Sequence, residues 1–195
     1  GVKHEERIQP GPARAAYEKV LTIDPSYTDA LVALARLDCQ RGKYAAAADF
    51  AKKATDRDPG KGMAWYYLGL ALMESPTEQR TMQPIDAAYR VIASLDYPSL
   101  GRDLAGRIRM REEQYALAVE EFKQAVALNP DDARAHQHLI AALHAAGQYA
   151  EADLRAMVRS VKYPLDFVPR AVASLRDKAK MDEYCAYVKQ VSGRP

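Results

Sequence analysis

The sequence contains few of the residues on which several fold classes depend. Val, Ile and Thr together make up only about 12% of the 195 residues, and since these β-branched types are the ones enriched in strands, a sheet-rich fold is not expected. The longest nearly uninterrupted apolar run, residues 64–73, is about half as long as a bilayer-spanning helix, which argues against a membrane span. Neither charge is in excess, because 28 basic and 26 acidic side chains leave a net charge of +2. A polyanion-binding tail is therefore absent.

Cysteine is also scarce. Cys39 and Cys185 lie far apart at otherwise apolar helical positions and without metal-ligand spacing, so we interpret both as small buried hydrophobes. A disulfide or a reactive thiol is the alternative. Such cysteine usage fits the reducing cytoplasm, which is the expected location. A periplasmic location stays open because the chain begins with Gly1 rather than Met, as a processed or excised product would.

Signatures of catalysis and of bound cofactors are missing as well. Residues 60–62 and 101–106 contain glycines but not the spacing of a phosphate-binding loop. The histidines at 4, 136, 138 and 144 include no pair with the i, i+4 spacing of a helical metal site. Basic residues are spread along the chain except for four arginines in 102–111, which no aromatic platform accompanies. We expect neither enzymatic activity, nor a metal or cofactor, nor nucleic-acid binding.

The sequence is, in contrast, rich in helix-forming residues. Ala, Leu, Glu, Lys and Arg account for about 47% of the chain, a share typical of long helices. Five tripeptides end in proline, which stops a helix because it lacks the N–H donor and disfavours helical backbone in the preceding residue. These prolines, separated by 34, 39, 32 and 34 residues, are Pro25, Pro59, Pro98, Pro130 and Pro164. Their near-constant spacing indicates an internal repeat.

Each repeat predicts a helical hairpin. Two amphipathic segments recur, separated by a short turn that ends in a tyrosine, at Tyr44, Tyr115 and Tyr149. The predicted helices are 12–23, 28–41, 44–57, 62–74, 84–95, 100–112, 115–128, 133–146, 149–161, 168–177 and 180–191. Thr28, Ser99 and Asp132 are predicted to cap helix N-termini with their side-chain oxygens. Residues 74–84 carry two prolines and predict a surface loop. We interpret this loop either as an insertion without function that the fold tolerates or as one that adds contacts for a partner.

The repeated units resemble the tetratricopeptide repeat (TPR) family. Residues 65–69, Trp-Tyr-Tyr-Leu-Gly, supply the first-helix signature, and Ala118, Phe122, Ala125 and Pro130 supply that of the second helix. The resemblance covers residues 13–164 and implies an all-α, right-handed superhelical solenoid of antiparallel helix pairs. Small residues at Ala47, Gly69, Gly106, Ala118 and Ala152 then let helices approach closely, while Tyr17, Trp65, Tyr89 and Phe122 fill the gaps between them.

The resemblance also divides the chain. Residues 1–27 are an N-terminal arm and the second helix of a truncated repeat, because no first helix precedes it. Four repeats follow at 28–59, 60–98, 99–130 and 131–164, and residues 165–195 fit the polar capping helices that a solenoid needs for solubility. The third repeat has the least typical first helix, with Arg102 and Ala105 at positions expected to be large and apolar.

In TPR proteins the first helix of each repeat lines a concave groove. Transferring the family's groove positions to this sequence, residue by residue, implies the candidate binding residues. They are Arg36, Tyr66, Tyr67, Leu70, Arg107, Arg111, Arg134 and His138, with Val32, Cys39, Gln40, Met63, Met73, Asp103, Leu104, Met110, Gln137, Ala141 and His144 at the other groove positions. Aromatic and arginine side chains suit an extended peptide. The surplus of arginine over Asp103 favours an acidic partner. The sites of the family's chaperone-tail clamp carry neither Asn nor Lys here, so an adaptor of that class is not expected.

These observations predict a non-catalytic scaffold that binds a partner protein or peptide in its groove, as the C-terminal part of a larger bacterial polypeptide. The alternative is a structural or dimerising appendage of an upstream enzyme domain that has no ligand of its own. The uncovered helix at 12–23 gives the chain a surface for self-association.

Overall fold

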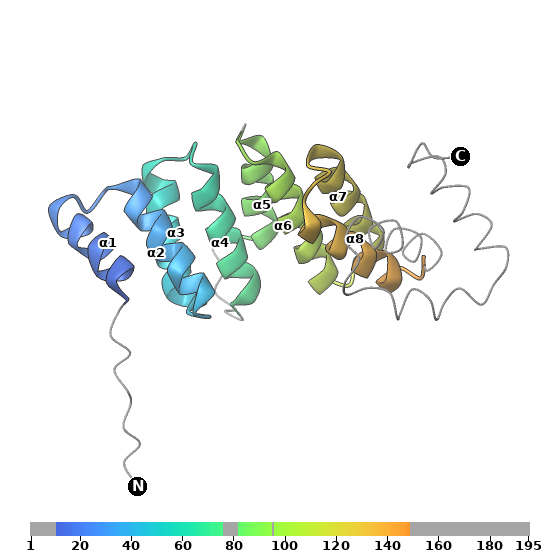
Figure 1. Ribbon diagram of the computed structural model, residues 1–195, viewed down its shortest axis with the longest axis horizontal. Helices are drawn as coiled ribbons and strands as arrows, with labels where there is room; N and C mark the ends of the chain where they lie inside the picture. Colours follow the sequence, from blue (N-terminus) through green and yellow to red (C-terminus); the bar gives the residue numbers. More distant parts are fainter. Residues whose placement is uncertain (1–10, 76–81, 95, 149–195) are drawn as a thin grey trace, which may run out of the picture. The chain divides into compact units, whose positions relative to one another are not determined.

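The computed structural model describes residues 11–75, 82–94 and 96–148, and these residues form eight α-helices and no strand (Figure 1). The helices are α1 (Pro12–Ile23), α2 (Thr28–Gln40), α3 (Tyr44–Arg57), α4 (Gly62–Glu74), α5 (Pro84–Ala93), α6 (Pro98–Arg111), α7 (Tyr115–Leu128) and α8 (Ala133–Ala145). The predicted all-α class is confirmed.

The observed helix bounds follow the proline stops and the turns. They differ from the predicted ranges by at most two residues at either end. The predicted helices at 149–161, 168–177 and 180–191, the capping segment 165–195 and most of the loop 74–84 lie outside the described residues. Within the described ranges, no helix is long and apolar enough to cross a membrane.

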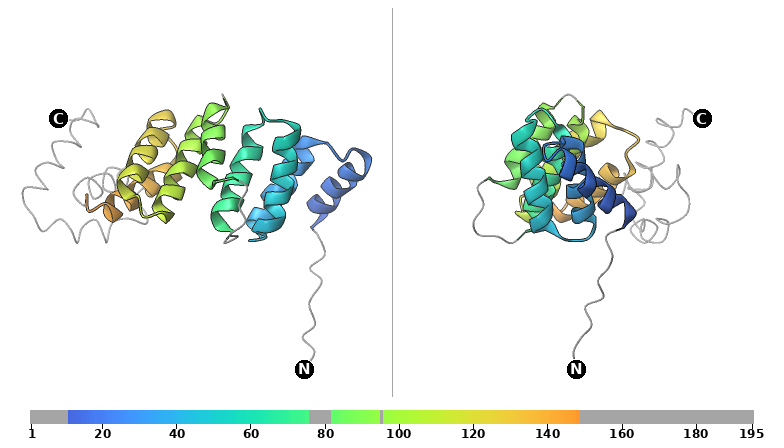
Figure 2. Two further views of the ribbon diagram at one scale, coloured as in Figure 1. Left: turned by 180° about the vertical axis from the view of Figure 1, so that it is seen from behind. Right: turned by 90° about the vertical axis from the view of Figure 1, so that its left-hand side faces the viewer.

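The chain forms two compact units, which divide within α6 after Leu104. In the first unit α1 packs on α2, α2 on α3, α3 on α4 and α4 on α5, and α2 also packs on α4. Figures 1 and 2 show α2, α3 and α4 lying side by side in this unit. Short turns join α1 to α2, α2 to α3 and α3 to α4, so these neighbours are antiparallel, as helical hairpins require.

Small residues bring the helices of the first unit close together. Ala47, Ala51 and Ala54 on α3 have no exposed surface. A Cβ atom placed on Gly69 of α4 would lie 2.8 Å from a Leu104 methyl group and 3.1 Å from the Ala87 Cβ. Since a Cβ atom essentially never lies within 3.0 Å of another side chain, Leu104 can approach α4 this closely because position 69 has no side chain.

The predicted role of Tyr89 is wrong. Instead of filling the gap between helices, its side chain is 42% exposed. The buried residues of α5 are Pro84, Ala87, Ala88 and Val91, which lie on one face of the helix. Tyr89 follows Ala87 by two positions, a rotation of about 200° around the helix that places it on the opposite face.

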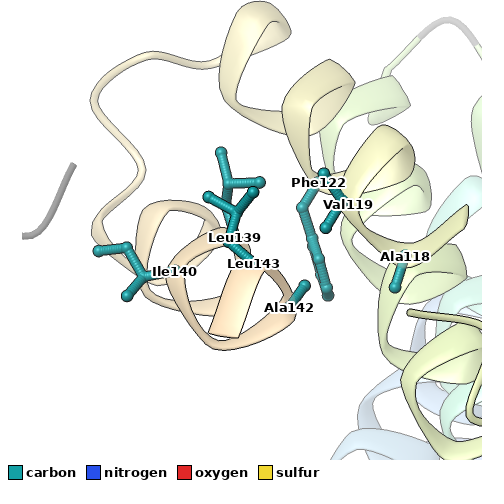
Figure 3. Packing of buried hydrophobic residues seen from close by; sticks show 7 residues of the cluster. All are labelled: Ala118, Val119, Phe122, Leu139, Ile140, Ala142 and Leu143. Atoms are coloured by element: carbon teal, nitrogen blue, oxygen red, sulfur yellow. The ribbon is translucent and has the colours of Figure 1, made fainter. Parts of the chain in front are cut away.

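In the second unit, α7 and α8 enclose a core of seven buried hydrophobic residues (Figure 3). They are Ala118, Val119, Phe122, Leu139, Ile140, Ala142 and Leu143. The largest of them, Phe122, is 1% exposed. A Cβ atom on Gly106 would lie 2.6 Å from the ring of Phe122, so the glycine of α6 makes room for the aromatic ring. Both predicted packing roles, at Gly106 and at Phe122, are confirmed.

Asx turns, in which an aspartate carboxylate accepts a hydrogen bond from the backbone two residues later, connect α1 to α2 and α3 to α4. The Asp24 carboxylate accepts hydrogen bonds from the backbone N–H and the hydroxyl of Ser26, and the Asp58 carboxylate accepts one from the N–H of Gly60. The bonds from Ser26 lower the pKa of Asp24. Both aspartates directly precede the prolines that end the second helices, so the same stop signal also builds the turn.

Only one of the three predicted N-caps is confirmed. The Asp132 carboxylate accepts hydrogen bonds from the backbone N–H groups of Arg134 and Ala135 at the start of α8. The predictions for Thr28 and Ser99 are wrong, because both residues lie within the first turn of their helices rather than before it. Tyr27 takes the capping position of α2 and makes no side-chain capping bond.

Equivalent turns in the two units share a left-handed residue after the first helix of the hairpin. Gly42 and Gly147 have φ angles of 70° and 74°, and Glu113 has a φ of 59°. In each case the N–H that follows bonds back to a carbonyl in the last turn of the helix. Glycine adopts this backbone freely, whereas a residue with a Cβ atom is strained in it.

We expect Glu113→Gly to raise the free energy of unfolding of the second unit by about 0.5–1 kcal/mol, because it removes that strain. The measurement is urea unfolding followed by circular dichroism. Gly42→Ala is the reciprocal control: a Cβ at position 42 meets no atom within 4 Å, so only backbone strain changes and stability should fall. An unchanged midpoint in both variants would show that these turns are not strained.

Candidate binding surface

The first unit presents two rows of side chains on its first helices. Val32, Arg36 and Cys39 of α2, and Met63, Tyr67 and Leu70 of α4, are spaced by four and three residues, so each row lies on one face of its helix. We call these six residues the α2/α4 surface. None of them is fully buried, and Arg36 is exposed. Because α2 packs on α4, the two rows are neighbours.

The two tyrosines predicted to line the groove have different environments. The rings of Tyr66 and Tyr67 are in an edge-to-face arrangement, with their centroids 5.2 Å apart and an interplanar angle of 75°. Tyr66 is only 9% exposed and belongs to the core, whereas Tyr67 is half-buried. Tyr67 therefore offers most of the contact area, and Tyr66 supports its ring.

Arg36 is near enough to Tyr67 for its positive charge to act on the phenol. Burial and the neighbouring Tyr66 raise the pKa of Tyr67, and the positive charge of Arg36 acts against them. Arg36 makes no ion pair with any other residue in the described ranges. The α2/α4 surface thus combines one available guanidinium group with a phenol and four largely apolar side chains.

Cys39 connects the two rows. Its Sγ lies 4.0 Å from the carbonyl oxygen of Tyr67, at the limit of a weak S–H hydrogen bond. Burial raises the pKa of the thiol to about 11, and the negative charges of Asp38 and Glu74 add to the effect. The interpretation of Cys39 as a small buried hydrophobe agrees with this partly buried environment.

We expect alkylation of Cys39 by iodoacetamide to be slow at pH 8, because the thiolate fraction is about one in a thousand at a pKa of about 11. The neutral thiol is the favoured form, so the rate should rise about tenfold per pH unit up to the pKa. Mass spectrometry of a Cys185→Ser variant measures it, with urea-unfolded protein as the reactive control. Fast labelling of the folded chain at pH 8 would contradict the buried environment.

The second unit carries the remaining predicted residues. Arg107 and Arg111 lie one turn apart on α6, and Arg134 and His138 lie one turn apart on α8. Arg111 and Arg134 are exposed, and Arg134 approaches Asp132 with 4.0 Å between its Nε and the Oδ1 atom. The His138 ring packs on the core, with its centroid 5.5 Å from that of Phe122. In this unit the arginines offer charge, while His138 serves packing as well.

Several other transferred groove positions are buried. Met73, Asp103 and Leu104 are 7%, 7% and 0% exposed, so little or none of their surface can contact a ligand. Residue type alone does not tell which of the transferred positions the neighbouring helices cover.

One important polar residue was not predicted. Asp38 on α2 has no exposed surface, and its Oδ1 accepts a hydrogen bond from Arg14 on α1. The only available signal is its position: Asp38 lies four residues before Gly42, as the buried Leu143 lies four residues before Gly147. No group of three or more His, Cys, Asp or Glu side chains in the described part of the chain could hold a metal ion.

Comparisons with known proteins agree with this architecture. The family descriptions "Tetratricopeptide repeat" and "TPR repeat" match residues 9–68 and 106–147, which together are more than half of the chain. No curated protein matches the sequence significantly.

Several solved structures are similar. A structure of the MamA protein is 26% identical, with a TM-score of 0.62 over 80% of this chain and 87% of its own. PilW, described as a type IV pilus biogenesis factor, is 17% identical with a TM-score of 0.71 over 93% and 85% of the two chains. YrrB, described as a TPR protein with an unusual peptide-binding site, is also 17% identical, with a TM-score of 0.60 over 93% and 94%.

Four observations agree: the proline-spaced hairpins, the small residues at the helix contacts, the two sequence matches and the shared solenoid fold. We conclude that the chain belongs to the tetratricopeptide repeat family.

Proposed function

We propose that this TPR chain is a non-catalytic scaffold that binds an extended segment of a partner protein along its first helices. The observation that carries the proposal is the α2/α4 surface, where aromatic, apolar and cationic side chains remain accessible although they lie next to a close-packed core. Rigid aromatic rings give contact area at low entropic cost, and arginine binds carboxylates through two parallel hydrogen bonds. YrrB, a protein with the same fold, is described as having a peptide-binding site.

The partner segment is proposed to be acidic. Arg36 in the first unit, and Arg107, Arg111 and Arg134 in the second, place positive charge on the first helices of both units. Only Asp103 among the transferred groove positions carries a negative charge, and it is almost fully buried. Association with an acidic segment should therefore be favoured at low salt and weaken as ionic strength rises.

The experiment is partner capture by the full chain, compared with a Tyr67→Ala, Arg107→Glu, Arg111→Glu variant. Tyr67 is the better target than Tyr66, because loss of the buried Tyr66 ring would damage the core. We expect the variant to lose the partners that the wild type retains at low salt, and quantitative mass spectrometry identifies them. A Lys52→Glu, Lys53→Glu, Arg57→Glu variant of the exposed side of α3 is the control. Equal capture by the two variants would refute the proposed surface.

The alternative, a dimerising appendage of an enzyme domain, is supported by a different feature. Ala47 and Ala118, each twelve residues before the proline that ends its repeat, are fully buried, whereas Ala13 at the equivalent place on α1 is exposed. Ile23 on the same helix is 81% exposed. Sedimentation velocity over a range of concentrations tests this function, and a monomer at all concentrations would exclude the dimerising form of the appendage while leaving a purely structural one.

A further inference from the structure

The α2/α4 surface has a specific charge pattern. Arg36 is its only charged residue and occupies the middle of the α2 row, between Val32 and Cys39. Tyr67 likewise occupies the middle of the α4 row, between Met63 and Leu70. The two polar groups of the surface therefore lie together, with apolar side chains on both sides along each helix.

We propose that Arg36 and the Tyr67 hydroxyl together bind the side-chain carboxylate of an acidic residue that is flanked by apolar residues in the partner segment. This inference rests on the proposed function and names the chemistry of one position in its ligand. The guanidinium donates two N–H groups in a plane, and the phenol donates an O–H, which matches the two oxygen atoms of one carboxylate.

The surroundings of Arg36 support this assignment. Asp38, the nearest carboxylate in sequence, is buried and engaged by Arg14. Glu74 is near Cys39, at the far end of the α4 row, and makes interactions of its own. Neither forms an ion pair with Arg36 within the described residues, so the guanidinium does not need to leave an internal partner in order to bind a ligand.

The apolar flanks select an internal side chain over the end of a chain. A C-terminal carboxylate held between Arg36 and Tyr67 would leave one flank of the surface uncovered, because no residue follows it. An Asp or Glu within the segment has neighbours on both sides. These neighbours can cover Val32 and Met63 at one end and Cys39 and Leu70 at the other, which removes apolar area from water.

The test uses a phage-displayed library of random twelve-residue peptides, selected on the immobilised full chain. We expect enrichment of peptides with one Asp or Glu between apolar residues. Synthetic copies should bind the Arg36→Gln variant about tenfold more weakly, because a charge-assisted hydrogen bond is lost. Tyr67→Phe should weaken binding about threefold, since it deletes only the hydroxyl.

Controls separate this inference from the proposed function. Arg57→Gln removes an exposed arginine from α3 and should leave peptide affinity unchanged. Thermal unfolding checks that the exposed substitution at Arg36 leaves the fold intact, and the Arg36 Nε–Hε signal in a ¹⁵N-labelled chain should shift on peptide addition. Selected peptides that bind Arg36→Gln as tightly as the wild type would overturn this inference and leave the proposed function standing. Failure to enrich any peptide would overturn both.

Discussion

Replacement of Phe122 by Ala is expected to lower the free energy of unfolding of the second unit by about 3–5 kcal/mol. The side chain is 1% exposed and lies between Gly106 of α6 and the buried residues of α8, which include Leu139 and Leu143 (Figure 3). Truncation removes the transfer free energy of the ring and leaves a cavity next to a residue that has no side chain to fill it. Urea unfolding and amide hydrogen exchange of α6, α7 and α8 measure the loss.

Two further variants distinguish the effect of a cavity at Phe122 from a general sensitivity of α7 to substitution. Leu117→Ala shortens a side chain that is 51% exposed on the same helix and should change stability by no more than about 0.5 kcal/mol. Gly106→Ala should destabilise the wild type, because its methyl group would lie 2.6 Å from the Phe122 ring. In the Phe122→Ala background the same methyl group occupies part of the cavity, so the sign of its effect should reverse. Equal losses for Leu117→Ala and Phe122→Ala would contradict the packing.

The fold was accessible to sequence reasoning because its determinants are local. Proline ends a helix by its own covalent structure, and the aspartate before it builds the turn from the same few residues, as at Asp24 and Asp58. The small residues at Gly69 and Gly106 were predictable from the repeat, and each is required by a neighbour less than 3 Å from the missing Cβ. Tyr89 was not, since the buried face of the short helix α5 is set by Ala87, Ala88 and Val91.

The candidate site was predicted less completely, for a physical reason. The helix α4 is apolar around most of its circumference, and eight of its thirteen residues are buried. Hydrophobic periodicity therefore cannot separate Tyr66, which lies in the core, from Tyr67, which is half-exposed. The roles of the arginines in binding stay predictions. What the structure adds is that Arg36 lies near enough to Tyr67 for its charge to act on the phenol, although the two residues belong to different helices and are not neighbours in sequence.

Asp38 represents the part of the structure that periodicity does not reveal. A carboxylate with no exposed surface is costly to bury, and its Oδ2 atom accepts no hydrogen bond from a described residue. Its other oxygen is bound by Arg14, 24 residues earlier, and this bond raises the pKa of the guanidinium. Arg14 also pairs with Glu18 at 2.7 Å, which fixes the arginine against α1. The helix α1 has no fully buried residue of its own, and besides this ion pair its partly buried Leu21 packs on the cluster that contains Leu31 of α2.

We therefore expect Arg14→Met to release α1 from the first unit and to lower stability by roughly 2–3 kcal/mol. This is less than the 3–5 kcal/mol lost when a fully buried pair is broken, because the Arg14 side chain is 17% exposed and detachment of α1 lets water reach Asp38. Amide hydrogen exchange should show loss of protection across residues 12–23, while α3 and α4 keep theirs. Arg57→Met, which removes an exposed arginine from α3, should do neither.

The double variant Arg14→Met, Asp38→Leu determines whether the destabilisation comes from the unpaired carboxylate. Leucine is the residue that the chain itself places, fully buried, at the equivalent position 143. Replacing a buried ion pair by apolar side chains of similar volume is often neutral or stabilising. The double variant should therefore recover the wild-type midpoint and the protection of α1. If it is no more stable than Arg14→Met, then the unpaired Asp38 carboxylate is not the source of the destabilisation.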